Sequence, residues 1–310
     1  MKTQTTRLSV LAGLPLLVAA CGADGGIAID HFSAEAEDAF CDNLVRCGDY
    51  PDKDTCKTVV YARNQLIADV QTGKIVYNGA AAADCLQSMR GFGCRLSTKP
   101  PIPASCDAIF RGTVADAGAC LEDEACVSGH CNLESCTADQ MCCAGVCEAR
   151  IPLGGACRAF ETCVVGTFCQ QDEITGAGFC VMPIAAGQPC RPGFDECADN
   201  LYCFGGPSGA PSTCGTLPAE GQPCGGGSSI CDDNQDICDS TTHVCTPRVA
   251  LGGNCASGIC QSFATCDPTS KTCVVRGRVG SSCTDSESCV AGLRCAGGVC
   301  TAHPDVPACG

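Results

Sequence analysis

Apolar residues recur at three- and four-residue steps in residues 33–112, and this is the spacing of the buried face of an α-helix. Three helices are expected there, at about 33–48, 52–73 and 80–90. Ser33 is placed to cap the first helix, and Phe40 and Leu44 to lie on its buried face. Asn78 is placed to cap the third helix. The pattern predicts a small all-α domain.

Six cysteines lie in this region: Cys41, Cys47, Cys56, Cys85, Cys94 and Cys106. A domain of this size buries too little apolar surface to be stable without further cross-links. We therefore expect three disulfides to staple the helices of residues 33–112.

The pattern changes after Cys106, where a Gly-containing turn followed by a cysteine recurs along the chain. The entrance cysteines of the repeat are Cys120, Cys157, Cys190, Cys224, Cys255 and Cys283. Their spacings of 37, 33, 34, 31 and 28 residues are typical of a tandem array. We number the units modules 1 to 6, at about 118–152, 153–186, 187–220, 221–252, 253–279 and 280–310.

Each module is short, and its cysteines are expected to form its core, with short β-hairpins and turns around them. Modules 1 and 6 hold odd numbers of cysteines, so at least one disulfide leaves its module if every cysteine pairs. The spacing does not give the pairing. The array cysteines are Cys120, Cys126, Cys131, Cys136, Cys142, Cys143 and Cys147; Cys157, Cys163, Cys169 and Cys180; Cys190, Cys197, Cys203 and Cys214; Cys224, Cys231, Cys238 and Cys245; Cys255, Cys260, Cys266 and Cys273; and Cys283, Cys289, Cys295, Cys300 and Cys309.

Composition agrees with a disulfide scaffold. The 310 residues include 35 Cys, 37 Gly and 17 Pro but no Trp, which favours cross-linked turns over one large core. A metal-binding alternative is disfavoured because the chain has no Cys-x-x-Cys or Cys-x-Cys spacing. The net charge of -15 disfavours a nucleic-acid partner.

The N-terminus reads as an export signal. Lys2 and Arg7 precede an apolar stretch that is shorter than the roughly 20 residues needed to span a membrane. The run Leu17–Cys21 resembles the lipobox of bacterial lipoproteins. The resemblance implies removal of residues 1–20, a lipid on Cys21 that anchors the protein in the membrane, and a linker at 21–32. A chance cysteine beside an ordinary cleavage site is the alternative.

By resemblance to the sorting rule of enteric bacteria, Gly22 after the lipid site favours the outer membrane. The leaflet and face of the membrane stay open.

Module 1 carries a second resemblance. Cys120-Leu-Glu-Asp-Glu-Ala-Cys126, then Cys131 and the adjacent pair Cys142-Cys143, resemble the N-terminal cysteine-rich domain of the Dickkopf family. The whole chain is more similar to bacterial cysteine-rich lipoproteins with tandem units. The resemblance implies a disulfide-framed binding or spacer module, and the longer array argues against a role in Wnt signalling.

Catalytic motifs are absent from the sequence. The four histidines, His31, His130, His243 and His303, are far apart and are expected in exposed loops. Asp232–Asp236 alternates oxygen ligands as a calcium loop does, but Ile237 and His243 break that motif, so a solvated acidic loop is expected. No catalytic residue, metal or cofactor is expected.

The leading hypothesis is a non-enzymatic, lipid-anchored surface protein whose array projects outward for adhesion, spacing or binding of a protein partner. A knottin-like inhibitor or receptor ligand is the first alternative. An enzyme housed in residues 35–112 is the second.

Overall fold

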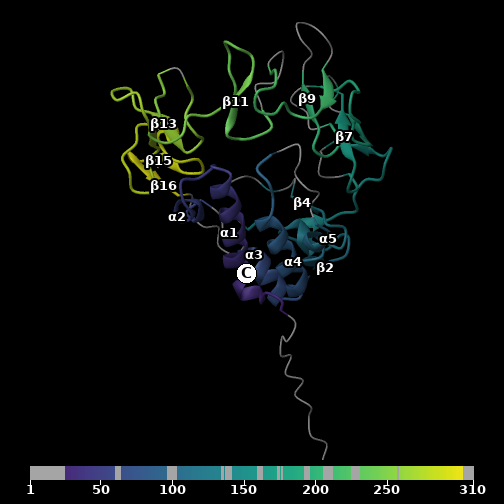
Figure 1. Ribbon diagram of the computed structural model, residues 1–310. Helices are drawn as coiled ribbons and strands as arrows, with labels where there is room; N and C mark the ends of the chain where they lie inside the picture. The colour runs from purple at the N-terminus through teal and green to yellow at the C-terminus, as the bar shows by residue number, and fades with distance from the viewer. Residues whose placement is uncertain are drawn as a thin grey trace, which may run out of the picture.

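The computed structural model of the chain describes residues 25–59, 64–95, 103–133, 136, 142–158, 163–172, 175, 177–191, 196–204, 212–224, 231–256 and 258–302. Helices from the first third of the chain form one body, and small sheets from the rest form an arch above it (Figure 1). This arrangement confirms the predicted fold class of an α-helical, disulfide-stapled domain followed by tandem small hairpin modules.

The helices are α1 (Ile29–Arg46), α2 (Lys53–Lys57), α3 (Asn64–Gln71), α4 (Gly79–Arg90) and α5 (Ala104–Asp107). The predicted cap of the third helix is confirmed, because the Asn78 side chain accepts a hydrogen bond of 3.1 Å from the Ala81 amide. Asp52 caps α2 in the same way, accepting from the Thr55 amide at 2.8 Å. Both caps satisfy amides that the helix itself leaves free.

The first helix begins earlier than predicted. α1 starts at Ile29 behind Ala28, and Ser33 lies within it with a buried hydroxyl that has no hydrogen-bond partner. Its buried face holds Phe32 and Ala39, whereas Phe40 is 42% exposed. The predicted cap is therefore wrong, and Phe40 does not belong to the buried face, whereas Leu44 is half-buried as part of it.

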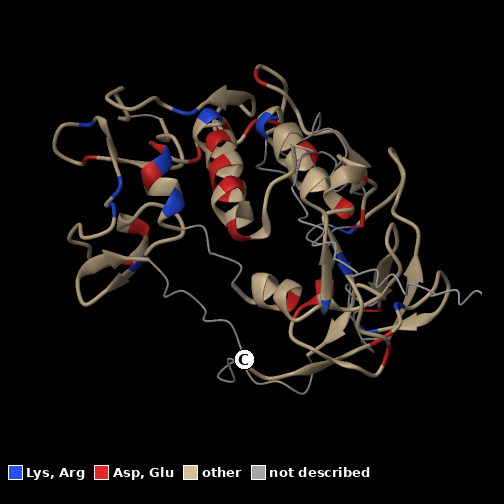
Figure 2. Cartoon of the chain, turned by 90° about the horizontal axis from the view of Figure 1, so that it is seen from below, with Lys and Arg blue, Asp and Glu red and all other residues tan. Residues whose placement is uncertain are grey.

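The predicted second helix is divided. α2 ends at Lys57 and α3 begins at Asn64, while residues 60–63 lie outside the described part of the chain. Lys53 bridges Asp38 and Asp42 of α1 at 2.8 Å each, and Lys57 also pairs with Asp38. Figure 2 shows acidic residues on successive turns of the long helix α1. The short α2 is thus attached to α1 by charge as well as by packing.

A two-stranded sheet completes the helical region. β1 (Ile75–Tyr77) pairs antiparallel with β2 (Phe110–Gly112). The rings of Phe32, Tyr77 and Phe110 meet edge to face or tilted, with centroids 5.1 to 5.8 Å apart. Burial by these neighbours raises the pKa of Tyr77 to about 12. This cluster draws α1 onto the sheet.

The modules contain short strands. Modules 1 and 2 have three-stranded sheets and modules 3 to 6 have two-stranded hairpins. The strands are β3 (Ala119–Cys120), β4 (Cys131–Asn132) and β5 (Gly145–Cys147); β6 (Ala156–Cys157), β7 (Phe168–Gln171) and β8 (Gly178–Val181); β9 (Tyr202–Phe204) and β10 (Thr213–Gly215); β11 (Asp236–Cys238) and β12 (Cys245–Pro247); β13 (Ala264–Cys266) and β14 (Cys273–Val275); and β15 (Arg294–Ala296) and β16 (Val299–Thr301). Single 3-10 turns, η1 (Asp123–Ala125) and η4 (Ser286–Ser288), lie in modules 1 and 6.

Each module starts with the same turn. One residue of this turn has a positive φ, and its amide donates a hydrogen bond of 2.7 to 2.9 Å to the carbonyl of the cysteine in the last strand of the module. That residue is glycine in modules 2 to 6, as in Gly154 with φ +81°, and Ala117 with φ +67° in module 1. Glycine suits the position because it alone adopts positive φ without a steric cost.

The array does not project outward as a free rod. Module 1 shares one core with the helices, in which Cys120 and Cys126 pack with Leu86 and Ile109. The chain then arches away and returns, so that the core of module 6 packs against Tyr50 and Val59 (Figure 1). The helical domain therefore holds both ends of the described array.

Candidate functional site

The six modules share one disulfide pattern. Among the first four cysteines of each of modules 2 to 6, the first cysteine bonds to the third, and the second cysteine bonds to the fourth. The bonds are Cys157–Cys169 and Cys163–Cys180, Cys190–Cys203 and Cys197–Cys214, Cys224–Cys238 and Cys231–Cys245, Cys255–Cys266 and Cys260–Cys273, and Cys283–Cys295 and Cys289–Cys300. Module 1 follows the pattern with Cys120–Cys131 and Cys126–Cys147. Two crossed bonds therefore replace a hydrophobic core in each module.

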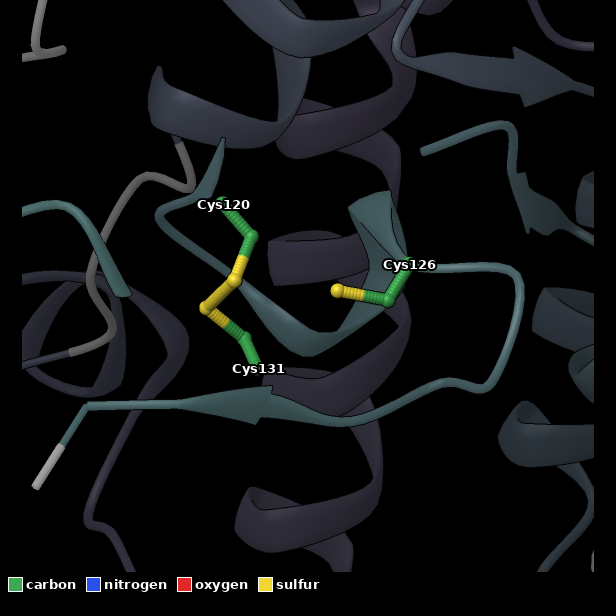
Figure 3. A group of neighbouring side chains, drawn as sticks. All are labelled: Cys120, Cys126 and Cys131. Atoms are coloured by element: carbon green, nitrogen blue, oxygen red, sulfur yellow. A yellow bond between two sulfur atoms is a disulfide. The ribbon is translucent and has the colours of Figure 1, made fainter. Parts of the chain in front are cut away.

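Crossed disulfides bring three sulfur atoms within 4.8 Å of one another, as for Cys120, Cys126 and Cys131 (Figure 3). Such a cluster resembles a metal site by distance alone. A sulfur atom binds metal as a thiolate, and each of these sulfurs is bonded to another sulfur. The clusters are therefore covalent cores of the modules.

The helical region has the three disulfides expected of it. They are Cys41–Cys56, Cys47–Cys94 and Cys85–Cys106. The first joins α1 to α2, the second closes a span of 47 residues, and the third joins α4 to α5.

Module 1 holds one bridge more than the others, Cys136–Cys143. Its remaining cysteine, Cys142, is also disulfide-bonded. Since the other six cysteines of module 1 pair among themselves, the bond of Cys142 leaves the module. All other described cysteines have partners among the sixteen disulfides, and Cys21 and Cys309 lie outside the described residues.

The histidines named in the sequence differ in their exposure to solvent. His243 is exposed as expected, and His31 is exposed but lies in helix α1 rather than in a loop. His130 is only 7% exposed, with its Nδ1 3.8 Å from Asp123. His303 lies outside the described residues. No described histidine is paired with a nucleophile.

The acidic segment 232–236 is not a solvated loop. Asp232 is 3% exposed, and Asp233 forms an antiparallel bridge with Arg95 of the helical region. Burial, together with the nearby charges of Asp233 and Glu220, raises the pKa of Asp236. The expectation failed because module 4 packs against the helical domain at this segment.

Arginines that the sequence interpretation missed link successive modules. Arg150 donates from Nε to the Ser128 carbonyl at 3.2 Å and from Nη1 to the Cys163 carbonyl at 3.3 Å, and it also bonds to the Gly129 carbonyl. It thus holds a loop of module 1 and the second cysteine of module 2 together. A guanidinium suits this role because its donors are fixed in a planar fork.

The same link recurs later in the array. Arg248 donates to the carbonyls of Asn234 at 3.1 Å and Cys260 at 3.2 Å, joining modules 4 and 5. Arg276 holds the same position before the entrance cysteine Cys283, but its bond to the Ala264 carbonyl at 3.3 Å lies within module 5. We call these side chains junction arginines.

The signal for them was present in the sequence. Each junction arginine lies seven residues before an entrance cysteine, as Arg150 does before Cys157. The same position holds Pro183 between modules 2 and 3 and Leu217 between modules 3 and 4. Leu217 is 4% exposed and fills its junction with an apolar side chain.

The last three modules contact the helical domain directly. The Ser262 hydroxyl of module 5 donates to the Gly48 carbonyl at 3.0 Å. In the segment that leads into module 6, Arg278 pairs with Asp52 at 2.7 Å, and the Tyr50 hydroxyl donates to the Ala291 carbonyl of module 6 at 3.2 Å. The arch is therefore closed by polar contacts as well as by packing.

Comparisons of the chain with family models, curated proteins and solved structures each found no match. In the described part of the chain, each helix is too short or too polar to cross a bilayer.

Proposed function

We propose that the protein is a non-enzymatic, exported surface protein, anchored by a lipid on Cys21, whose disulfide-framed array binds a protein partner. The observation that carries the proposal is the repetition of one covalent frame in six modules with different loops. Such a frame fixes loop shape without supplying a reactive group. Dense disulfides persist in an oxidising compartment, which supports export.

The absence of free thiolates supports a binding role over a catalytic one. Among the described residues every cysteine is in a disulfide, so none is available as a nucleophile or metal ligand. Within the described helical region, burial raises the pKa of Tyr77 to about 12, and the Tyr77 hydroxyl donates to the Ile27 carbonyl at 2.9 Å inside the core. That tyrosine has a structural role.

Counting the cysteines supports the lipid on Cys21. The chain has 35 cysteines, the sixteen disulfides use 32, and Cys142 is bonded as well, which leaves Cys21 and Cys309. If Cys142 bonds to one of these two, a single cysteine is left without an intrachain partner. A lipobox assigns that role to Cys21, and we therefore expect a Cys142–Cys309 bond.

Intact-protein mass spectrometry on material from its native membrane tests the proposal. We expect a mature chain that begins at an acylated Cys21 and in which 34 cysteines react with an alkylating agent only after reduction. Peptide mapping without reduction should recover Cys142 linked to Cys309. A chain without lipid, or one with Cys21 in a disulfide, would refute the anchor, and free thiols would refute the oxidised array.

A further inference from the structure

A cavity of about 400 Å³ lies at the junction of modules 2 and 3. Module 2 contributes the loop before and into β7, and module 3 contributes the segment from its second cysteine to β9 (Figure 1). Its lining includes Gly166, Phe168, Pro183, Cys197, Asp199 and Tyr202. In the described part of the chain, the contacts to the helical domain given above come from modules 1, 4, 5 and 6, and the cavity lies between the two modules that make none of them.

The cavity occupies the place of a junction arginine. Pro183 lies seven residues before Cys190, the position that holds Arg150 one junction earlier. Arg150 bonds to the carbonyl of Cys163, and the corresponding second cysteine of module 3 is Cys197, which lines the cavity. Proline is too short to reach across this space, and its ring has no hydrogen-bond donor.

The backbone acceptors of the junction are therefore left unused. At the earlier junction Arg150 also bonds to Gly129, three residues after the second cysteine of module 1. The residue in that position of module 2 is Gly166, which also lines the cavity. Within the described residues no hydrogen bond reaches the carbonyl of Gly166 or Cys197. Two residues whose counterparts bind a guanidinium through their carbonyls at the earlier junction thus line the cavity.

The charge and the types of side chain at the cavity also favour a guanidinium group as the ligand. Asp199 is exposed at the lining and supplies a carboxylate, which pairs with a guanidinium through two parallel hydrogen bonds. Phe168 and Tyr202 add aromatic surface, on which a guanidinium stacks. The net charge of -15 adds a long-range attraction for a basic partner.

A different contact holds this junction open. Arg191 of module 3 bonds to the carboxylate of Glu196, which is 1% exposed, and donates from Nη1 to the Gln171 carbonyl of module 2 at 2.8 Å. This contact joins the two modules through Gln171, Arg191 and Glu196, which are not among the residues that line the cavity. This geometry keeps the site formed before a ligand arrives.

We propose that this cavity binds an arginine side chain presented by a protein partner. The site deepens the partner-binding function proposed above, on which it rests, by naming the group that the partner supplies. The partner's guanidinium takes the place that Arg150 takes at the preceding junction, donates to the carbonyls of Gly166 and Cys197, and pairs with Asp199.

NMR titration of the intact, oxidised chain tests the site. The probes are acetyl-Gly-Arg-Gly-amide and acetyl-Gly-Lys-Gly-amide. We expect the arginine peptide to shift the amide signals of Gly166, Ala198 and Asn200. The lysine peptide should bind at least about tenfold more weakly, because an ammonium group lacks the planar fork. Free arginine amide should shift the same signals more weakly than the arginine peptide does. This difference is expected if the natural ligand is an arginine within the polypeptide chain of a protein partner.

Two variants separate the cavity from general charge attraction. Pro183→Arg should fill the cavity from within the chain and weaken arginine-peptide binding at least about tenfold, while raising the thermal midpoint. Ala186→Arg adds the same charge on an exposed turn at the end of module 2 and should change binding by less than about threefold. Asp199→Asn should weaken it severalfold and leave folding intact, since Asp199 is exposed.

Equal shifts with the two peptides, or unchanged binding by Pro183→Arg, would overturn the site. Either result would leave the proposed function standing, because the lipid on Cys21 and the oxidised array are measured separately by mass spectrometry. A chain without the lipid that still binds the arginine peptide would refute the anchor and retain the cavity.

Discussion

At the scale of single residues, the repeated turn at the start of each module depends on one backbone conformation. The amide of Gly154 donates to the Cys180 carbonyl at 2.7 Å, and the amide of Ala117 makes the equivalent bond to Cys147 at 2.8 Å. Both residues have positive φ, but only one is glycine. Alanine in this region carries a steric cost that glycine does not.

We predict opposite effects for exchange of these two residues. Ala117→Gly should stabilise module 1 by up to about 1 kcal/mol, and Gly154→Ala should destabilise module 2 by about the same amount. A Cβ at Gly154 would have no atom within 4 Å, so the effect would come from the backbone alone.

Hydrogen exchange at Cys147 and Cys180 measures this locally, and about 1 kcal/mol corresponds to a roughly fivefold change in protection. Each variant is the control for the other. Equal losses of protection would contradict the explanation.

At the scale of elements, the caps show which features of a helix are local. Asn78 and its helix were predictable because the cap and the residues it bonds to are three apart in sequence. The start of α1 was not, because it depends on Phe32 packing between Tyr77 and Phe110, which are distant in the chain. Ser33 was a plausible cap only while that packing was unknown.

The modules show the same division between local and distant information. Their period and the use of cysteine as a core were visible in the spacing. The crossed pairing was not, because several pairings satisfy the same spacing. The junction arginines were visible as a fixed offset from the entrance cysteines, but their role required the carbonyls of the neighbouring module.

Asp52 joins two parts of the chain, since it caps α2 and pairs with Arg278 in the segment that leads into module 6. Asp52→Ala should cost about 1 to 2 kcal/mol, because the cap and the ion pair are both lost. Asp52→Asn retains a capping oxygen and should cost about 0.2 to 1 kcal/mol. Denaturant unfolding of the oxidised chain distinguishes the two. Equal losses would mean that the cap contributes nothing.

The contact between α1 and α2 should weaken in acid. Hydrogen bonds from Lys53 and then Lys57 lower the pKa of Asp38 to about 2. Because the folded-state pKa is lowered, this contribution is complete above about pH 4 and is lost as the pH falls towards about 2. Its size should be about 1 kcal/mol or less, since the side chains are 33 to 37% exposed.

Denaturant unfolding between pH 5 and 2 tests this with two variants. Asp38→Asn should remove this part of the pH dependence. Glu37→Gln removes a neighbouring carboxylate that has no ion pair among the described residues and should leave it unchanged. A pH profile that is the same in Asp38→Asn and the original chain would contradict the assignment.

At the scale of the whole molecule, the array is an arch with both ends on one helical body. Module 1 merges with the core of that body, and module 6 docks on the segments on either side of α2, through Tyr50 and Val59. Modules 4 and 5 also contact the helical domain, through Asp233 and Ser262, and modules 2 and 3 form the part of the arch between modules 1 and 4 (Figure 1). The loops of modules 2 and 3 are therefore held between two attached parts of the array, which suits the partner binding proposed above.

Module 6 should be released by reversing one charge. Arg278→Glu would place a carboxylate beside Asp52, and the contact from Tyr50 to Ala291 and the packing of Val59 on Gly292 would then hold the module alone. We expect faster hydrogen exchange at residues 289–293 and in α2, with the disulfides of module 6 intact. Arg294→Glu makes the same charge change at an exposed position of β15 and should leave exchange unchanged. Faster exchange in both variants would show that total charge, rather than the pair with Asp52, governs the closure of the arch.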